Sequence, residues 1–381
     1  MLSAREGPPG ETAPERRSLI VPSTTRTQAT AIDAVDLRKT YPGGRGRPPV
    51  AALDGLSFAV PAGTVFALLG PNGAGKSTTA KILTTLSRAD SGTASVAGID
   101  VARHPERVRR AIGYVAQKPV TDPMDSGREN LVLAGRLQGL GARDARARAT
   151  ELLDRFSLTD AADRLVRTYS GGMARKLDVA MGIVHRPRVL FLDEPTTGLD
   201  PEARAEMWAE IERMTARESM TILLTTHYLE EADRLAANLA IVDHGRVAVA
   251  GTPDALKDEL RGDGIVVELA PGVGLPDGGA AVADRVTAAV GTCAGVRDVH
   301  VEGRTLRARA DSGAVALPAV LTALDAAGLP VASATLARPS LDDVYLRHTG
   351  RTFTAAQSSA GATPGGGSGA DAGATVEGVA A

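Results

Sequence analysis

Three short, largely apolar runs mark the first two thirds of the chain, and each ends at polar residues. They cover residues 64–69, 189–192 and 221–226, and they lead into a glycine-rich segment, an Asp-Glu pair and a histidine. Apolar runs of this length without alternation are typical of parallel strands that are buried on both faces. Because the carboxyl ends of parallel strands meet at one edge of a sheet, the pattern predicts an α/β fold with a ligand site at that edge.

The remaining periodicity predicts two further regions. Residues 129–164 are rich in alanine and arginine and place apolar positions at helical spacing, which predicts a helical subdomain. After Gly264 the expected order is β-α-β-β-α-β, which is ferredoxin-like. The strands are expected at 265–269, 296–301, 305–310 and 331–336, the helices at 281–290 and 317–327, and a last short helix at 341–346.

The two ends of the chain differ from the rest in composition. Residues 1–30 are polar and rich in Pro, Thr and Arg, while residues 351–381 contain a Gly/Ser run at 365–369, so both segments are expected to be disordered. The predicted organisation is a disordered segment 1–30, an α/β domain 31–263, a small ferredoxin-like α+β domain 264–350 and a disordered tail 351–381.

Charge and cysteine content argue against several classes of protein. Lys and Arg total 43 against 45 Asp and Glu, so there is no basic excess for nucleic acid and no nucleic-acid partner is expected. The single cysteine, Cys293, excludes an intramolecular disulfide. No stretch approaches the ~20 apolar residues of a membrane span, and residues 1–30 lack the apolar core of a signal peptide. The chain is therefore expected in the cytosol unless a partner holds it at a membrane.

The glycine-rich segment after the first run fits Gly-x-x-x-x-Gly-Lys-[Ser/Thr], the loop whose backbone N–H groups cradle phosphates. It lies between an expected strand and an expected helix, which is the context that this motif requires. In such a loop the lysine reaches the β/γ-phosphates and the hydroxyl residue holds Mg²⁺, so a nucleotide and Mg²⁺ are the expected ligands. The loop residues are Gly70, Pro71, Asn72, Gly73, Ala74, Gly75, Lys76, Ser77 and Thr78.

Two carboxylates and a histidine follow the other two runs. Asp193 and Glu194 come directly after the second run, and His227 comes after the third. Adjacent carboxylates project differently from the end of a strand. One of them can therefore support a hard cation such as Mg²⁺ while the other positions a water for in-line attack.

Taken in order, these motifs resemble the nucleotide-binding subunit of an ATP-binding cassette (ABC) transporter. The order is the loop at 70–78, Ser170-Gly171-Gly172, Asp193-Glu194 and His227, and the resemblance covers about residues 33–263. It implies a P-loop NTPase cassette with a parallel-sheet core and a helical subdomain. It also implies that Asp193 supports Mg²⁺ together with Ser77, and that Glu194 polarises the attacking water.

The same resemblance implies roles for three isolated residues. His227 is expected to contact the γ-phosphate and to orient Glu194. Gln117 is expected to touch Mg²⁺ and the attacking water and to signal to a membrane partner. Tyr41 is expected to stack on the adenine ring, although an insertion rich in Gly, Arg and Pro follows it.

The resemblance further implies two protein partners. Ser170, Gly171 and Gly172 are expected to bind the γ-phosphate of ATP held by a second copy of the cassette, and Asp200 is expected at the seam between the copies. Met173 stands where the commonest form of this signature has glutamine. Closure of the pair around two ATP molecules is expected to drive an integral membrane permease encoded in another chain.

Three stretches narrow the subfamily. Residues 169–178, 193–201 and 340–346 look like the daunorubicin/doxorubicin-resistance type of antibiotic-exporter ATPase. This implies a bacterial peripheral protein at the cytoplasmic face of the plasma membrane, and the abundance of alanine and glycine suggests a GC-rich genome.

The alternatives are a lipid or small-peptide exporter, an importer ATPase with a regulatory module, and a soluble cassette protein acting on ribosomes or DNA. The last class needs two cassettes in one chain, or a coiled-coil or zinc insertion, which this sequence does not show. The C-terminal module, which has no phosphate loop, is expected to contact a protein partner and to take no part in hydrolysis.

Overall fold

The computed structural model describes residues 29–43, 48–260, 262–271 and 279–361. Most of the two segments expected to be disordered, residues 1–28 and 362–381, lies outside the described residues. The central sheet has six strands in the order β10-β9-β3-β8-β7-β6. The strands are β3 (Val65–Leu69), β6 (Ile112–Val115), β7 (Val189–Asp193), β8 (Thr221–Thr226), β9 (Asn238–Asp243) and β10 (Arg246–Gly251).

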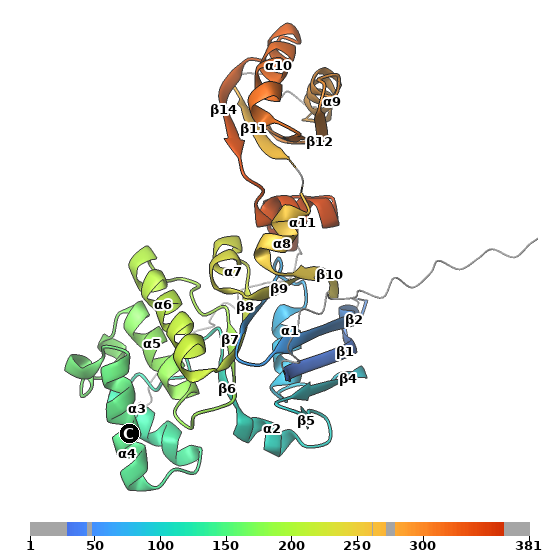
Figure 1. Cartoon of the computed structure of the whole chain (residues 1–381). Coiled ribbons are helices and arrows are strands. Elements are labelled where there is room, and N and C mark those ends of the chain that lie inside the picture. The colour runs from blue at the N-terminus through green and yellow to red at the C-terminus, as the bar shows by residue number, and fades with distance from the viewer. Residues whose placement is uncertain (1–28, 44–47, 261, 272–278, 362–381) are drawn as a thin grey trace, which may run out of the picture.

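The three apolar runs are the adjacent strands β3, β8 and β7, and each of them pairs in parallel with its neighbour. Every residue of these strands is buried. Figure 1 shows helices on both faces of the sheet, which explains why the runs lack polar alternation. The predicted parallel α/β core is therefore confirmed.

Alternate residues of the central strands pack against different helices. On one face, Leu190 and Leu224 join a core with α5 (Gly171–Gly182) and α6 (Pro201–Glu218). On the other face, Phe66 and Phe191 pack with α1 (Lys76–Leu83) and an antiparallel sheet ordered β2-β1-β4-β5. That second sheet comprises β1 (Thr30–Tyr41), β2 (Val50–Pro61), β4 (Ser91–Val96) and β5 (Ile99–Asp100), followed by α2 (Pro105–Ala111).

The helical subdomain predicted between the first two runs is present. It contains α3 (Gly127–Leu137) and α4 (Ala142–Arg155), two short 3₁₀ turns (Thr159–Ala161 and Val166–Thr168), and then α5. Helix α3 begins with a capping box in which Ser126 and Glu129 satisfy each other's backbone N–H groups. After β8, α7 (Leu229–Leu235) and α8 (Pro253–Asp258) complete this part of the fold.

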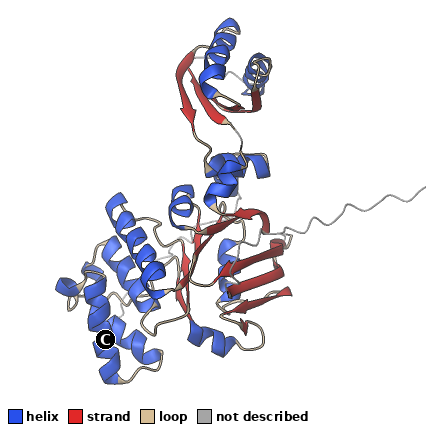
Figure 2. Ribbon diagram, viewed as in Figure 1, coloured by secondary structure: helices blue, strands red, loops and turns tan. Residues whose placement is uncertain are grey.

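The C-terminal module has the predicted β-α-β-β-α-β order. Its elements are β11 (Asp263–Leu269), α9 (Gly279–Val290), β12 (Val296–Glu302), β13 (Thr305–Ala310), α10 (Gly313–Ala326) and β14 (Val331–Ala337). The antiparallel sheet order is β12-β13-β11-β14, the ferredoxin-like arrangement. In Figures 1 and 2 the module stands beyond α8, away from the helical subdomain.

After the module the chain returns to the cassette. The expected short helix is α11 (Leu341–Thr349), with its own capping box between Ser340 and Asp343. The prediction that the chain is disordered from residue 351 is wrong for residues 353–361, which form helix α12 (Phe353–Gly361). Phe353 and Ala356 are buried, because their spacing of three gives a short helix one apolar face.

Candidate active site

The phosphate loop connects β3 to α1 and is held by its own lysine. The Lys76 ammonium donates to the carbonyl oxygens of Gly70 (2.7 Å) and Pro71 (3.1 Å). Gly75 caps α1 with φ 109°, a conformation that disfavours side chains, and a Cβ there would meet the Ala52 oxygen at 2.6 Å. The loop is therefore already folded around the position where backbone N–H groups and a helix N-terminus favour phosphate.

The other loop residues occupy its tip and its base. Asn72 and Gly73 are exposed, with φ 78° at Gly73. Ala74 is buried and accepts a hydrogen bond from the Gly245 N–H (2.9 Å), which belongs to the turn between β9 and β10. Thr78 lies half-buried in the first turn of α1. The tip is thus open to a ligand while the base is fixed against a neighbouring turn.

Asp193 lies opposite the loop and faces Ser77. The Ser77 hydroxyl donates to Oδ1 of Asp193 at 3.2 Å, and the Thr225 hydroxyl of β8 donates to the same oxygen. Asp193 is only 4% exposed. Burial and the nearby Asp193 charge raise the pKa of Tyr114 to about 12, so this phenol stays neutral. The sequence did not single out Thr225, because a hydroxyl at the end of an apolar strand carries no motif of its own.

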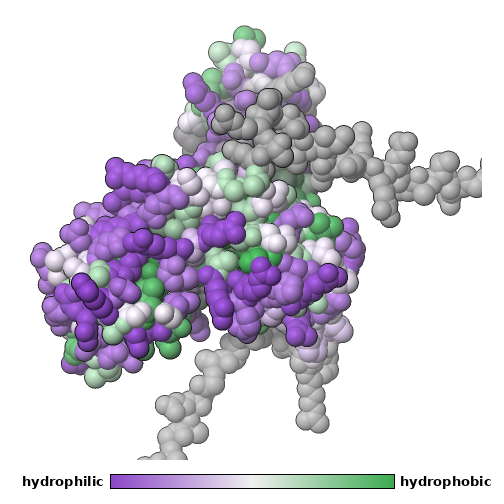
Figure 3. All heavy atoms as spheres, turned by 60° about the horizontal axis from the view of Figure 1, so that its bottom comes forward, coloured by the Kyte–Doolittle hydropathy of each residue, from purple (hydrophilic) through white to green (hydrophobic). Residues whose placement is uncertain are grey.

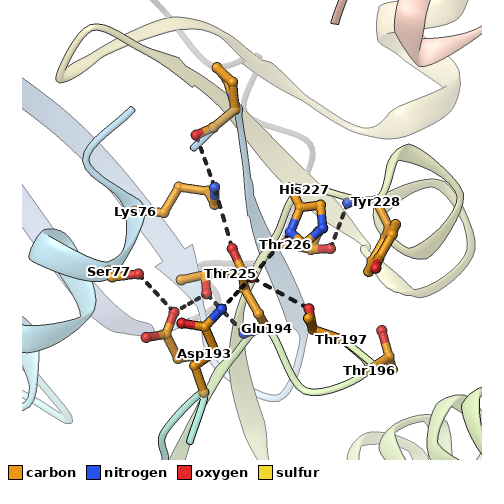
Figure 4. A network of polar contacts seen from close by, with 12 residues as sticks. Lys76, Ser77, Asp193, Glu194, Thr196, Thr197, Thr225, Thr226, His227 and Tyr228 are labelled. Carbon is orange, nitrogen blue, oxygen red and sulfur yellow. Dashed lines mark hydrogen bonds and ion pairs between the residues drawn. The ribbon is translucent and has the colours of Figure 1, made fainter. Parts of the chain in front are cut away.

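Glu194 is the centre of the site (Figure 4). Its Oε2 accepts a hydrogen bond from Gln117 Nε2 at 3.0 Å and lies 3.1 Å from His227 Nδ1, while Oε1 lies 3.7 Å from the Lys76 ammonium. The Thr197 hydroxyl reaches Oε2 at 3.4 Å. We call Lys76, Ser77, Gln117, Asp193, Glu194 and His227 the catalytic cluster.

The backbone and the charge of Glu194 are both unusual. Its φ is 49°, a costly conformation for a side-chain-bearing residue, and its N–H is held by the Thr225 carbonyl at 3.0 Å. Burial tends to raise the pKa of Glu194, but the His227 imidazole, the Lys76 charge and the Thr197 hydroxyl outweigh it and hold that pKa below the ordinary value. The carboxylate is therefore ionised and aimed into the site.

Arg175 organises the backbone around the cluster. Its buried guanidinium donates to the carbonyl oxygens of Ala116 (2.6 Å), Pro195 (2.8 Å) and Asp193 (3.2 Å). It thereby ties α5 to the end of β7 and to the segment that carries Gln117. No motif indicates this role of Arg175, because these carbonyl groups come from segments far apart in the chain.

Four predicted residues lie away from the cluster. Ser170 caps α5 by accepting from the Met173 N–H (3.2 Å), and Asp200 caps α6 by accepting from the Ala203 N–H (2.9 Å). Gly171 and Gly172 form the first turn of α5, and a Cβ on Gly172 would meet Ala203 Cβ at 2.8 Å. Within the described residues, neither cap is hydrogen-bonded to the catalytic cluster, and both side chains are exposed.

Tyr41 also lies outside the cluster. It ends β1, is 37% exposed and has the Lys39 ammonium 5.5 Å from its ring centroid. Its strand pairs with β2, whose Ala52 lies against Gly75 of the phosphate loop. The ring is thus on the strand pair beside the loop, and its stacking on adenine stays a prediction.

Comparison with known proteins places the chain among transport ATPases. The ABC transporter family matches residues 53–197, and the C-terminal domain of DrrA1-3-like ATP-binding proteins matches residues 251–349. The daunorubicin resistance ATP-binding protein DrrA2 of Streptomyces coeruleorubidus is 48% identical over 78% of this chain and 90% of its own length. The daunorubicin/doxorubicin resistance ATP-binding protein DrrA of Streptomyces peucetius is 46% identical over 85% and 94%.

Solved structures agree with the fold. An ATP-binding subunit of an ABC transporter is 32% identical, with a TM-score of 0.53 over 60% of this chain and 93% of that one. Across the described part of the chain, no helix is both long and apolar enough to cross a membrane.

Proposed function

Because this chain belongs to the ATP-binding subunits of ABC transporters of the daunorubicin/doxorubicin-resistance type, we propose that it hydrolyses ATP to power the efflux of antibiotics and other hydrophobic drugs through a separate membrane permease. One observation carries the hydrolytic part. An ionised, buried carboxylate, Glu194, faces the phosphate loop while Gln117, Lys76 and His227 surround it. This is the arrangement of a general base beside a phosphate clamp.

The residues of the cluster divide the work. Lys76 lies in the loop that holds the β/γ-phosphates and supplies the positive charge that in-line transfer requires. Glu194 accepts a hydrogen bond from the attacking water and takes up its proton. His227 and Gln117 fix the carboxylate from two sides, so that its orientation does not depend on the nucleotide alone.

Mg²⁺ fits the donor set at the base of the site. The Ser77 hydroxyl and the Asp193 carboxylate present hard oxygen ligands 3.2 Å apart. Within the described residues no group of three or more His, Cys, Asp or Glu could hold a metal by itself. Ser77 and Asp193 would hold Mg²⁺ together with oxygens of the bound phosphates, and the ion would neutralise phosphate charge there.

A second copy of the cassette is the proposed partner for the start of α5. Ser170 and Gly171, at the start of this helix, are exposed. A phosphate brought to them by another copy would gain a helix N-terminus and a serine hydroxyl. Asp200 starts the adjacent α6 and would lie at the same contact.

The membrane permease is proposed to bind the helical subdomain. Most of the face seen in Figure 3 is hydrophilic, with separate apolar spots. Large apolar side chains are exposed in this subdomain and in the segment after Gln117, namely Val120 (61%), Met124 (64%), Leu133 (50%) and Leu137 (79%). Because Gln117 holds Glu194, a partner seated here could act on the catalytic base. Such a partner would hold the chain at the cytoplasmic face of a bacterial plasma membrane.

Co-expression with its cognate permease in a drug-sensitive host tests this function. Intracellular accumulation of fluorescent doxorubicin should fall when both proteins are present, and Lys76→Ala should restore it. Lys81→Ala, an exposed lysine on the same helix, is the matched control and should leave efflux intact. Unchanged accumulation over a panel of hydrophobic drugs, with ATPase activity retained, would contradict drug export and favour lipid or small-peptide export.

A further inference from the structure

The segment that follows α11 contacts residues that lie next to the nucleotide site. Residues 351–357, which we call the C-terminal clamp, include the start of α12 and lie against the carboxyl-end edge of the central sheet. Phe353 stacks edge-on against Tyr345 of α11, with ring centroids 5.0 Å apart. Both side chains are buried in one apolar cluster with Leu69, the last residue of β3 before the phosphate loop.

One end of the clamp holds the turn between β9 and β10. The Arg351 guanidinium donates to Asp243 Oδ1 at 2.8 Å and lies 2.9 Å from His244 Nε2. The buried Tyr345 hydroxyl reaches the same Asp243 oxygen at 3.2 Å. A charge-assisted contact of this kind is about twice as strong as a neutral hydrogen bond, so Arg351 makes the stronger of these two contacts to Asp243.

That turn and the end of β9 are each in direct contact with the phosphate loop. The Gly245 N–H donates to the Ala74 carbonyl at 2.9 Å. At the other side of the loop, a Cβ on Gly70 would come within 2.3 Å of the Val242 carbonyl, so backbone meets backbone there. Arg351 thus contacts Asp243 and His244, and the next residue, Gly245, contacts the base of the phosphate loop.

The other end of the clamp reaches His227. Gln357 Nε2 donates to the His227 carbonyl at 3.4 Å. The His227 side chain in turn lies 3.1 Å from Glu194. One end of the clamp is therefore linked to the phosphate loop through the turn between β9 and β10. The other end is linked to Glu194 through His227.

We infer that the C-terminal clamp positions the ATP site, Arg351 through the phosphate loop and Gln357 through His227. The inference rests on the proposed ATPase function and extends it to a part of the chain expected to be disordered. It predicts that substitutions at the two ends of the clamp change different kinetic constants. A shifted phosphate loop weakens ATP binding and raises KM, whereas a shifted His227 disturbs the base and lowers kcat.

Steady-state ATPase kinetics on the full chain separate these effects. Arg351→Ala should raise the KM for Mg-ATP by about tenfold, the usual effect of one charge-assisted contact, with kcat within about twofold. Arg351→Lys keeps the charge at Asp243 but cannot bridge to His244, so it should recover much of that loss. Gln357→Ala should lower kcat by about two- to threefold, since its hydrogen bond is long.

The matched control is Ser358→Ala, on the next residue of α12, where the side chain is exposed and bonds only within its own helix. It should leave both constants unchanged. Hydrogen exchange provides a readout without turnover, because the Gly245 amide should exchange faster in Arg351→Ala than in the parent, while amides of α3 and α4 should not.

The inference would be overturned if Arg351→Ala and Gln357→Ala, both folded at the assay temperature, kept the parent KM and kcat and the parent exchange at Gly245. The clamp would then only add stability, which a lower melting temperature alone would show. A parent chain that hydrolyses no ATP under any condition would instead contradict the proposed function.

Discussion

The catalytic cluster and the starts of α5 and α6 differ in how their polar groups are satisfied. Lys76 and Glu194 are 4% and 8% exposed and pair with each other across distant segments of the chain, and Glu194 also accepts a hydrogen bond from Gln117. Ser170 and Asp200 are exposed and, among the described residues, bond only to the first turn of their own helices. One region is assembled within a single chain, and the other presents capped helix ends to solvent. Both regions appear in the sequence as short polar motifs, but only the catalytic cluster is assembled within one chain.

Loss of Lys76, in the catalytic cluster, should have the largest effect on ATP hydrolysis. Lys76→Ala removes the charge that clamps the β/γ-phosphates and leaves Glu194 without its nearest cation, so no hydrolysis above background is expected. Phosphate release by the purified chain measures it, with Lys81→Ala as the control. Hydrolysis at the parent rate would mean that the cluster is not the site.

Glu194→Gln should keep the cluster assembled and remove its base. ATP binding should persist, while turnover falls by about 10²- to 10⁴-fold, the usual share of a positioned general base. If the exposed helix ends meet a second copy, this variant should also accumulate as an ATP-bound dimer, measured by light scattering. A chain that stays monomeric with ATP at high protein concentration would contradict the proposed two-copy contact.

Ser170→Ala tests the exposed half alone. It removes the cap of α5 at a cost of about 1 kcal/mol of stability, and it should leave nucleotide binding by the single chain unchanged. Turnover should fall by about tenfold, because the charge-assisted contact to a partner's phosphate is lost.

Thr252→Ala is the control for Ser170→Ala, because it removes an equivalent exposed cap from α8. Equal turnover in the two variants would show that Ser170 serves only its own helix.

Glu231, a buried carboxyl group of α7, should give the smallest effect, a change in the pH dependence of stability. Burial raises its pKa, although Thr196 and Trp208 hydrogen-bond to its carboxyl group. The folded chain therefore keeps a proton that the unfolded chain loses above pH ~4.3. The free energy of unfolding of the parent, relative to that of Glu231→Gln, should decline as the pH rises from ~4.3 to the higher pKa of Glu231 in the folded chain.

Denaturant unfolding followed by Trp208, the sole tryptophan, measures this pH dependence. Glu230→Gln, at the exposed neighbouring position, is the control and should not change the slope. A parallel pH dependence of the parent and Glu231→Gln would show that the buried carboxyl is charged in the folded chain.

The sequence predicted what is local. The β3 strand, the glycine-rich loop and α1 follow one another, so their order specifies the phosphate site without distant contacts. The ferredoxin-like order after Gly264 was predicted for a similar reason, since each of its elements carries its own periodicity. The same reasoning grouped Asp193, Glu194 and His227 correctly, because parallel strands end at one edge.

What the sequence did not predict depends on contacts between distant segments. Arg175 meets the carbonyl groups of residues 116 and 193–195 only after α5 packs beside β7. The positive φ of Glu194 has no signature in a residue type that rarely adopts it. Helix α12 is followed in the sequence by a Gly/Ser run at 365–369, and that composition obscured the two apolar residues that anchor the helix.

The ferredoxin-like sheet begins and ends at neighbouring positions of the fold. Its first and last strands pair with each other, with Gly264 opposite Ala337, so the chain leaves the cassette and returns to it at almost the same place. In terms of chain topology the module is a domain inserted ahead of the cassette's last two helices. A splice that joins residue 263 to residue 338 through a short linker would delete the module and keep Arg351 and Gln357. A stop codon at residue 263 would remove both. The two deletions are therefore different experiments, and only the splice reports on the module itself.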